Sequence, residues 1–478
     1  MLSTTSQLDA ALDIAAKLRA AGYEAYFAGG CVRDLLLGRE PKDFDVATSA
    51  EPNVVLGMFE RTFAVGAQFG VVLVVLGSED EQIVTEVATF RSDGAYSDGR
   101  HPDAVRYTTS AEEDVKRRDF TINGLLLDPF VGGRLPSDLL DDPTALRKGL
   151  IDYVGGIADL HTGVIRAIGR PEARFEEDRL RMLRAVRFAA RFGFAIEPET
   201  MRAIRALAKR IDSVSRERVR DELTRMLTEG HARRAFELLD ETGLLAQVLP
   251  EIARMKGVEQ PPEYHPEGDV WIHTLLLLDQ LQPGCSPTLA WGALLHDVGK
   301  PPTFRRAPDR IRFDGHVEVG VAMGAEICRG FRFSNEETRQ IVALIENHMR
   351  FAHADKMRSS TLKRFFRIEG FEEHLALHKM DCLAANGNLD HWEFVRERWQ
   401  AMPVETLRPK PLITGRELIA AGYKPGAGFK EMLRAVEDAQ LEGAIGSEEE
   451  ALRLVRERFP LIEASRVAPS ASADETNG

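Results

Sequence analysis

The spacing of apolar residues divides the chain into two parts. From the start to about residue 165, short apolar runs alternate with helical segments, and the strand candidates are 25–28, 44–47, 71–76, 83–90, 122–127 and 164–168. From about residue 170 onward, apolar positions recur at helical spacing and strand patterns disappear. The pattern predicts an α+β fold, in which an α/β head with a small mixed sheet precedes an all-helical remainder.

Proline-rich and glycine-rich turns indicate how the remainder is subdivided. The C-terminal end is rich in Ser, Ala and Asp, a composition that does not support a packed core. We therefore expect five segments: a head at 1–168, a helical neck at 169–235, an all-helical body at 236–400, a helical tail at 401–465 and a disordered end at 466–478.

Candidate chemistry begins in the first half of the head. The turn Gly29-Gly30 precedes a helical segment that carries Arg33, and such a turn lets phosphates approach backbone N–H groups beside a fixed positive charge. Asp43 and Asp45 alternate in a strand candidate, so their carboxylates share one face and suit hard divalent cations such as Mg²⁺. The combination indicates metal-assisted transfer of a nucleotidyl group. An exposed polar turn is the alternative.

Further polar groups follow in the head. Glu86 is a candidate third carboxylate or an edge-strand charge, and the polar loop at 90–103 predicts a lid. Arg118 can meet phosphates, while Asp119 and Asn123 can form hydrogen bonds with ribose hydroxyls. We therefore expect these groups to belong to the same nucleotide site.

These motifs, AGGCVRD, DFD and KRRDFTIN, resemble those of class II nucleotidyltransferases, the family of bacterial tRNA CCA-adding enzymes and poly(A) polymerases. The likeness covers roughly residues 20–460. It implies that Asp43 and Asp45 are catalytic and hold two Mg²⁺ ions, and that CTP, ATP and the 3′ end of tRNA are the substrates. It also implies that the glycine turn, Arg33 and the second motif bind the nucleotide.

The neck contains the motif EDRLR, in which Asp178 and Arg181 would be neighbours on a helix, with Arg184 and Arg187 continuing the same side. An Asp acceptor beside an Arg donor complements the pairing edges of cytosine and adenine, but not those of uracil or guanine. One protein template would thus accept CTP and ATP. The resemblance assigns this role to the motif. A Glu177–Arg181 ion pair on a solvated helix is the alternative.

A second constellation of imidazoles and carboxylates follows the neck. Such ligands suit Mg²⁺, Mn²⁺, Ni²⁺ or iron rather than a thiolate zinc site. The adjacent His296-Asp297 pair resembles the HD superfamily of metal-dependent phosphohydrolases, whose ligand pattern maps onto His273, His296, Asp297 and Asp381. The resemblance implies a second divalent metal and phosphodiester or cyclic phosphate hydrolysis. A relic HD body that only holds RNA is the alternative.

Composition changes this picture only in part. The net charge of −13 is unfavourable for an RNA enzyme, but residues 166–234 carry 18 Lys and Arg against 11 Asp and Glu, which predicts an RNA-facing surface or a solvated helical face. Four scattered cysteines, an acid-containing N-terminal helix and the lack of a long apolar run indicate a cytoplasmic protein without a membrane span. The oligomeric state stays open.

Several functions remain in competition. Poly(A) polymerases carry an arginine-rich run after the metal strand, whereas the matching segment here, VGAQFGV at 65–71, is nearer the CCA-adding pattern. We therefore predict template-independent addition of CCA. Poly(A) synthesis, or addition of only CC or only A, is the alternative. An HD phosphohydrolase with an inert RNA-binding head and a non-catalytic RNA-binding protein are readings from other classes.

Overall fold

The computed structural model describes residues 4–64, 70–77, 82–93, 105–131, 143–263 and 265–461. Residues 94–103 of the expected lid, most of the segment used to weigh poly(A) synthesis and the C-terminal end lie outside these residues. The described start of the predicted lid is strand β6 (Arg91–Asp93), which pairs with β7 (Val105–Tyr107). The chain forms two compact units, Met1–Glu346 with Ala384–Asn386, and Asn347–Leu383 with Gly387–Gly478. The finer division into head, neck, body and tail stays a prediction.

The head is built on a seven-stranded sheet with the order β3-β4-β5-β2-β1-β8-β9. Strands β2 and β5 run parallel, and the other neighbours are antiparallel. The mixed sheet, followed by helices, confirms the predicted α+β class. The strands are β1 (Ala25–Ala28), β2 (Val46–Thr48), β3 (Thr62–Phe63), β4 (Val71–Gly77), β5 (Gln82–Thr89), β8 (Leu125–Leu127) and β9 (Leu150–Asp152).

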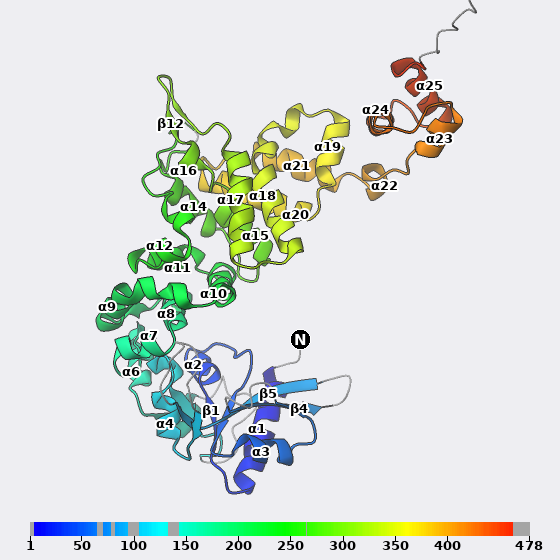
Figure 1. Ribbon diagram of the computed structural model, residues 1–478. Coiled ribbons are helices and arrows are strands. Elements are labelled where there is room, and N and C mark those ends of the chain that lie inside the picture. Colours follow the sequence, from blue (N-terminus) through cyan, green and yellow to red (C-terminus); the bar gives the residue numbers. More distant parts are fainter. Residues whose placement is uncertain are drawn as a thin grey trace, which may run out of the picture. The chain divides into compact units, whose positions relative to one another are not determined.

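Alternation along β5 separates the two faces of the sheet. Thr85, Val87 and Thr89 are buried, whereas Glu86 and Ala88 point to the other side. Helices α1 (Thr4–Ala20) and α3 (Pro52–Met58) cover the buried face, and α2 (Gly30–Leu36) lies on the opposite face (Figure 1). The face that carries Glu86 is therefore free to form a site. Helices α4 (Ala111–Lys116), α5 (Pro143–Gly149) and α6 (Gly156–Thr162) complete the head.

Two strand predictions need correction. The candidate at 122–127 begins as a 3-10 turn, Thr121–Asn123, because the Asp119 side chain accepts hydrogen bonds from the Phe120 N–H and the Asn123 amide and so competes with the ladder. Strands also occur beyond residue 170: β11 (Ala195–Ile196), which pairs with β10 (Val164–Ile165) inside the predicted strand 164–168, and β12 (Arg305–Arg306), which pairs with β13 (Ile311–Arg312). Two residues are too few to show a period of two.

Helices follow the head without a long break. Helix α8 (Leu180–Phe192) is amphipathic and packs with its apolar face, including Leu183, Val186 and Ala190, against α10 (Arg216–Thr228) and α11 (Ala232–Glu241). In Figure 1, α7 (Pro171–Glu177), α8 and α9 (Pro198–Leu207) lie on the side of the sheet that carries α2. The unit continues with α12 (Leu245–Val248), α13 (Pro250–Ala253), α14 (Val270–Leu278), α15 (Pro287–Leu295), α16 (Lys300–Thr303), α17 (His316–Gly330) and α18 (Asn335–Asn347).

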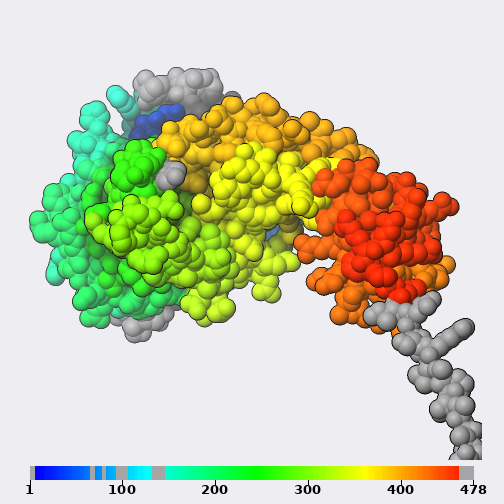
Figure 2. All heavy atoms as spheres, turned by 90° about the horizontal axis from the view of Figure 1, so that it is seen from above, coloured from blue at the N-terminus to red at the C-terminus, as the bar shows by residue number. Residues whose placement is uncertain are grey.

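The second unit is helical in its described part and has two apolar clusters. The first is centred on aromatic residues such as Phe351, Phe365 and Phe371, and the second includes Leu418 and Val455. Atoms of the last three helices gather into one body in Figure 2, coloured orange to red. The helices are α19 (Ser359–Phe366), α20 (Phe371–Ala384), α21 (Asp390–Gln400), α22 (Val404–Leu407), α23 (Gly415–Ala420), α24 (Gly428–Glu442) and α25 (Glu448–Arg458). Across the described ranges, no helix is both long and apolar enough to cross a membrane.

Candidate active site

A cleft of about 680 Å³ opens between the free face of the sheet and the start of α8. Most of the predicted site residues of the head and neck meet there, although they come from segments more than 150 positions apart. Those lining the cleft are Gly29, Gly30, Arg33, Asp45, Glu86, Arg118, Asp119, Asn123, Asp178, Arg181 and Arg184. Asp43 is exposed two residues before Asp45.

Carboxylates form the wall of the cleft on the sheet side. In the β2–β5 register, Val46 pairs with Val87 and Ala47 with Ala88, which aligns Asp45 with Glu86 on the same face. Burial, followed by the negative charges of Glu86 and Asp43, raises the pKa of Asp45 to about 7. Burial and Asp43 also raise the pKa of Glu86. Three mutually repelling carboxylates fit a site for hard divalent cations.

The strand predicted around Asp45 starts later than expected and does not include Asp45. The structure begins β2 at Val46, so the 44–47 candidate is displaced and Asp43 precedes the ladder. Asp45 still lies in line with the sheet because its carbonyl accepts a hydrogen bond from the Ala28 N–H at 3.1 Å. Glu86 lies on β5, which has neighbours on both sides, so it is not an edge-strand charge.

The glycine turn lies where β1 meets α2. Gly29 has φ +73°, a conformation that favours glycine, and a Cβ there would come within 3.1 Å of Arg118 Nη1. Arg33, one turn into α2, is buried; it donates to Asn123 Oδ1 at 2.6 Å and lies over the Phe192 ring at 4.7 Å. The turn can admit a phosphate close to the backbone, while Arg33 also ties α2 to the second motif.

The second motif is fixed by ion pairs. Asp119 accepts from Arg184 Nη2 at 2.7 Å and from Asn123 Nδ2 at 3.1 Å. Burial alone would raise the pKa of Asp119, but the charge of Arg184 and these hydrogen bonds outweigh it and lower the pKa to about 2. Arg118 pairs with buried Asp114 at 3.0 Å. Asp119 is therefore an ionised acceptor held in a constant position.

The neck motif differs from its prediction. Helix α7 ends at Glu177 and α8 begins at Leu180, so Asp178 lies in an extended link and not on one helix with Arg181. Asp178 accepts from Arg218 of α10 at 2.8 Å, and Arg181 pairs with Glu177 at 2.7 Å. The Glu177–Arg181 ion pair is thus present, but the Arg181 side chain is only 12% exposed and lines the cleft. It is not part of a solvated face.

Arg187 does not reach the cleft. Each helical residue turns by about 100°, so Arg187 lies about 120° around α8 from Arg181, whereas position 188 lies within about 20° of it. The Arg187 guanidinium is 5% exposed and binds Glu222 at 2.7 Å. Phe188 lines the cleft instead, and helical spacing from Arg181 would have identified it. Arg218 also lines the cleft, and no local pattern points to it.

The predicted HD residues of the first unit also meet. Asp297 Oδ2 lies 3.2 Å from His296 Nε2 and 3.9 Å from His273 Nε2. His296 Nδ1 faces the Ala293 carbonyl at 2.8 Å, and His273 Nδ1 faces Glu267 at 2.7 Å. Because both oxygens are acceptors, they favour the tautomer with the proton on Nδ1, which leaves Nε2 available as a metal ligand.

This arrangement is a donor set of the kind that binds a divalent cation. His316 has the same contact as His296, because its Nδ1 faces a backbone carbonyl, that of Phe313, at 2.9 Å. Lys300 Nζ lies 2.7 Å from Asp297 Oδ2 and already balances part of its charge. Asp381 belongs to the second unit, on α20.

Comparisons with known proteins give consistent matches along the chain. The sequence model of the "Poly A polymerase head domain" matches residues 25–166, that of the "Probable RNA and SrmB- binding site of polymerase A" matches 193–256, and that of the "tRNA nucleotidyltransferase domain 2" matches 317–455. The CCA-adding enzyme of Geobacillus stearothermophilus is 31% identical over 449 residues, which are 92% of this chain and 95% of the relative. That of Levilactobacillus brevis is 32% identical over 433 residues, 90% and 93% of the two chains.

Solved structures agree with the sequence matches. The crystal structure of Bacillus stearothermophilus CCA-adding enzyme in complex with CTP has a TM-score of 0.70 and 28% identity, and the match covers 96% of this chain and 98% of that one. Thermotoga maritima CCA-adding enzyme complexed with tRNA has a TM-score of 0.55 at 18% identity, over 94% and 95% of the chains, which shows a likeness of fold.

Proposed function

This chain belongs to the CCA-adding enzyme family, and from that premise we propose that it transfers CMP and AMP from CTP and ATP to the 3′ end of tRNA in the cytoplasm. The observation that supports this most directly is the cleft. There Asp45 and Glu86 face Asp178 and Arg181 across a space for a nucleotide. All four cysteines are free, as a reducing compartment requires.

Asp43 and Asp45 are the proposed ligands of two Mg²⁺ ions, with Glu86 as a third carboxylate beside them. Burial, and after it the negative charges of Glu86 and Asp43, raises the pKa of Asp45, and a bound cation would favour its ionised form. When bound, the ions make the acceptor 3′-hydroxyl a better nucleophile and stabilise the leaving pyrophosphate. Asp45 would hold the ions as a deprotonated carboxylate on the free face of the sheet.

Three groups of the head bind the rest of the nucleotide. The Gly29-Gly30 turn gives the triphosphate access to the backbone, and Arg33 supplies charge beside it. Arg118 meets a phosphate. Asp119 accepts hydrogen bonds from the ribose hydroxyls, and Asn123 donates to them. The low pKa of Asp119 keeps it an ionised acceptor throughout the physiological pH range.

Asp178 and Arg181 read the base, and Arg184 fixes Asp119 next to them. In the free protein both reading groups are engaged by protein partners, Arg218 and Glu177. Cytosine or adenine offers an amino donor to Asp178 and a ring nitrogen to Arg181, so the exchange preserves hydrogen bonds, whereas uracil or guanine would leave them unmatched. Arg187 supports this motif indirectly, because its bond to Glu222 packs α8 on α10.

The test uses tRNA transcripts that end before CCA, each labelled NTP and Mg²⁺. We expect CMP addition, then AMP addition after two cytidines, and then arrest. Asp43→Ala abolishes incorporation and leaves RNA binding nearly intact, and retained turnover in this variant would refute the assigned role. A growing A tail would identify the poly(A) reading, and arrest after CC or dependence on a CC end would identify a partial enzyme.

The HD constellation of the first unit is a second candidate activity, metal-dependent phosphohydrolysis at His273, His296 and Asp297. The observation that favours it is the approach of two imidazole nitrogens to one carboxylate oxygen: His296 Nε2 lies 3.2 Å and His273 Nε2 lies 3.9 Å from Asp297 Oδ2. Mn²⁺, Ni²⁺ or Mg²⁺ would supply a polarised water there. Bis-p-nitrophenyl phosphate with Ni²⁺ tests it: His296→Ala should abolish hydrolysis and preserve CMP addition. Absence of metal binding by the unaltered protein would contradict it.

A further inference from the structure

One row of side chains crosses the free face of the sheet and ends on an aromatic ring. Phe63 of the edge strand β3 pairs with Leu73 of β4, and Leu73 pairs with Glu86 of β5. Residues directly opposite each other in a ladder point to the same face, and Glu86 aligns with Asp45. The row therefore runs from Phe63 through Leu73 to the two carboxylates.

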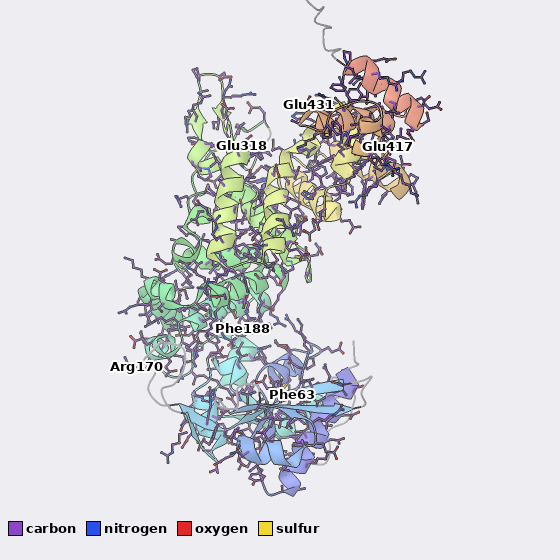
Figure 3. The ribbon with its side chains drawn as sticks, turned by 45° about the vertical axis from the view of Figure 1, so that its right-hand side comes forward. Phe63, Arg170, Phe188, Glu318, Glu417 and Glu431 are labelled. Carbon is purple, nitrogen blue, oxygen red and sulfur yellow. The ribbon has the colours of Figure 1, made fainter. Side chains whose placement is uncertain are left out.

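The aromatic end of the row is uncovered. Phe63 is 59% exposed, and Val84, on the same face of β5, is 52% exposed. Figure 3 labels Phe63 at the side of the sheet that is turned toward α8, where Phe188 is labelled. A large aromatic side chain on an exposed edge strand, continuous with a polar cleft, indicates a surface that another molecule covers.

The row and the helical wall lie on different sides of the two carboxylates. The base-reading residues Asp178 and Arg181 lie on the helical wall, so the incoming base is directed to that wall. Neighbouring strands are about 4.8 Å apart, which places Phe63 about 10 Å from Glu86 along the sheet. A nucleoside that presents its 3′-oxygen to the carboxylates from the sheet side would therefore extend its base toward Phe63.

We propose that Phe63 is the stacking platform for the 3′-terminal base of the RNA acceptor. This inference rests on the proposed function, because it needs an acceptor hydroxyl at Asp43 and Asp45. The chemistry matches the occupant: the terminal base of the acceptor changes after every addition, so its support must not depend on a hydrogen-bond pattern. An aromatic ring stacks on any base.

Charge near the platform fits the same occupant. Arg61 lies two residues before Phe63, directly before β3, and it donates to the Gly77 carbonyl, which leaves further N–H groups of its guanidinium for a phosphate. Single-stranded nucleic acid is commonly held by such a combination of an aromatic ring and an arginine. Phe63 is accordingly a positioning residue: it contacts the acceptor base and not the reacting phosphorus.

The experiment compares Phe63→Ala, Phe63→Trp and the matched control Phe304→Ala, which removes another exposed phenylalanine of the same unit. Steady-state CMP addition to a tRNA transcript ending before CCA gives kcat/KM for the acceptor and KM for CTP. We expect Phe63→Ala to lower kcat/KM for the acceptor about tenfold with KM for CTP unchanged, and Phe63→Trp to restore it. Phe304→Ala should match the unaltered protein.

A second readout does not depend on turnover. An acceptor with 2-aminopurine at its 3′ end is bound without NTP, and stacking on Phe63 should quench its fluorescence in the unaltered protein and in Phe63→Trp but not in Phe63→Ala. If kinetics and quenching are unchanged in Phe63→Ala, Phe63 is not the stacking platform. CMP addition by the unaltered protein would still support the proposed function in that case. A change in oligomeric state in place of these effects would assign the ring to a second copy of the chain and overturn the proposal. If the unaltered protein adds no nucleotide, both the proposed function and the stacking role of Phe63 are overturned.

Discussion

Like charges lie together on the sheet wall of the cleft, whereas opposite charges are paired on its helical wall. On the sheet wall, burial followed by the charges of Glu86 and Asp43 raises the pKa of Asp45, and burial followed by the charge of Asp43 raises the pKa of Glu86. On the helical wall, Asp178 and Arg181 each have an opposite charge within 2.8 Å. The negative charge of the sheet wall would be balanced only by an added cation, whereas the charges of the helical wall are already paired within the protein.

Because of this difference, we expect the two walls to contribute separately to substrate binding: the sheet wall to metal binding and the helical wall to base selection. The sheet wall gains free energy from any divalent cation that relieves its repulsion. In the proposed base-reading role, the helical wall would give up its ion pairs, so only a base that replaces both partners would be accepted without loss. Affinity for metal and selectivity for base should therefore respond to separate substitutions.

We expect the largest effect on activity from a substitution in the sheet wall. Asp45→Asn keeps the shape of the side chain but removes a charged ligand, and we expect kcat for CMP addition to fall by about 10³-fold or more, because charge stabilisation in the transition state is lost. Single-turnover incorporation measures it. Binding of tRNA in a filter assay serves as the control and should be nearly unchanged; a loss of less than about tenfold would show that Asp45 is not a ligand.

The next effect breaks the helical wall. Arg181→Ala removes the donor to the ring nitrogen, and we expect discrimination of CTP over UTP to fall by about 10²-fold, because an unmatched hydrogen bond no longer penalises uracil. The ratio of kcat/KM values for the two triphosphates measures it. Arg205→Ala on α9, whose guanidinium binds the Glu241 carbonyl away from the cleft, is the matched control. Unchanged discrimination would remove the protein template from the explanation.

The sequence predicted the members of both walls better than their partners. The strand β1 and the motifs around Gly29, Asp43, Arg118 and Asp178 could be found because each is a local pattern. The alignment of Glu86 with Asp45 depends on the register of two parallel strands, which no local pattern determines. Contacts of this kind arise from tertiary packing.

Other features of the site could be predicted only in part. The bond between Arg218 and Asp178 joins positions 40 residues apart, and only the packing of α10 on α8 creates it. The orientation of Arg187 is different, since the helical rotation alone separates it from Arg181 and the error was in the interpretation. The start of α8 at Leu180 depends on the extended conformation of Asp178, which its ion pair with Arg218 holds.

A smaller effect sharpens the account of the sheet wall. Because the pKa of Asp45 is about 7 without metal, a proton occupies the carboxylate below that pH and competes with the cation. We expect the apparent Mg²⁺ affinity to weaken about tenfold from pH 8 to pH 6. Mg²⁺ titrations of the first turnover measure it. In Glu86→Gln the pKa of Asp45 should fall, and the pH dependence should move toward lower pH; an identical profile would contradict the coupling.

The smallest effect compares the same substitution in both walls. The folded pKa of Asp45 lies above its unfolded value, so without divalent cations this carboxyl opposes folding as pH rises from about 4 to 7, and fully above 7. At pH 8, Asp45→Asn should therefore stabilise the metal-free protein by about 1 kcal/mol, and at pH 5 it should change little. Asp178→Asn should destabilise it by about 1 kcal/mol, because Arg218 loses its charged partner. Thermal unfolding with EDTA at both pH values measures both variants, and equal signs at pH 8 would contradict the contrast between the walls.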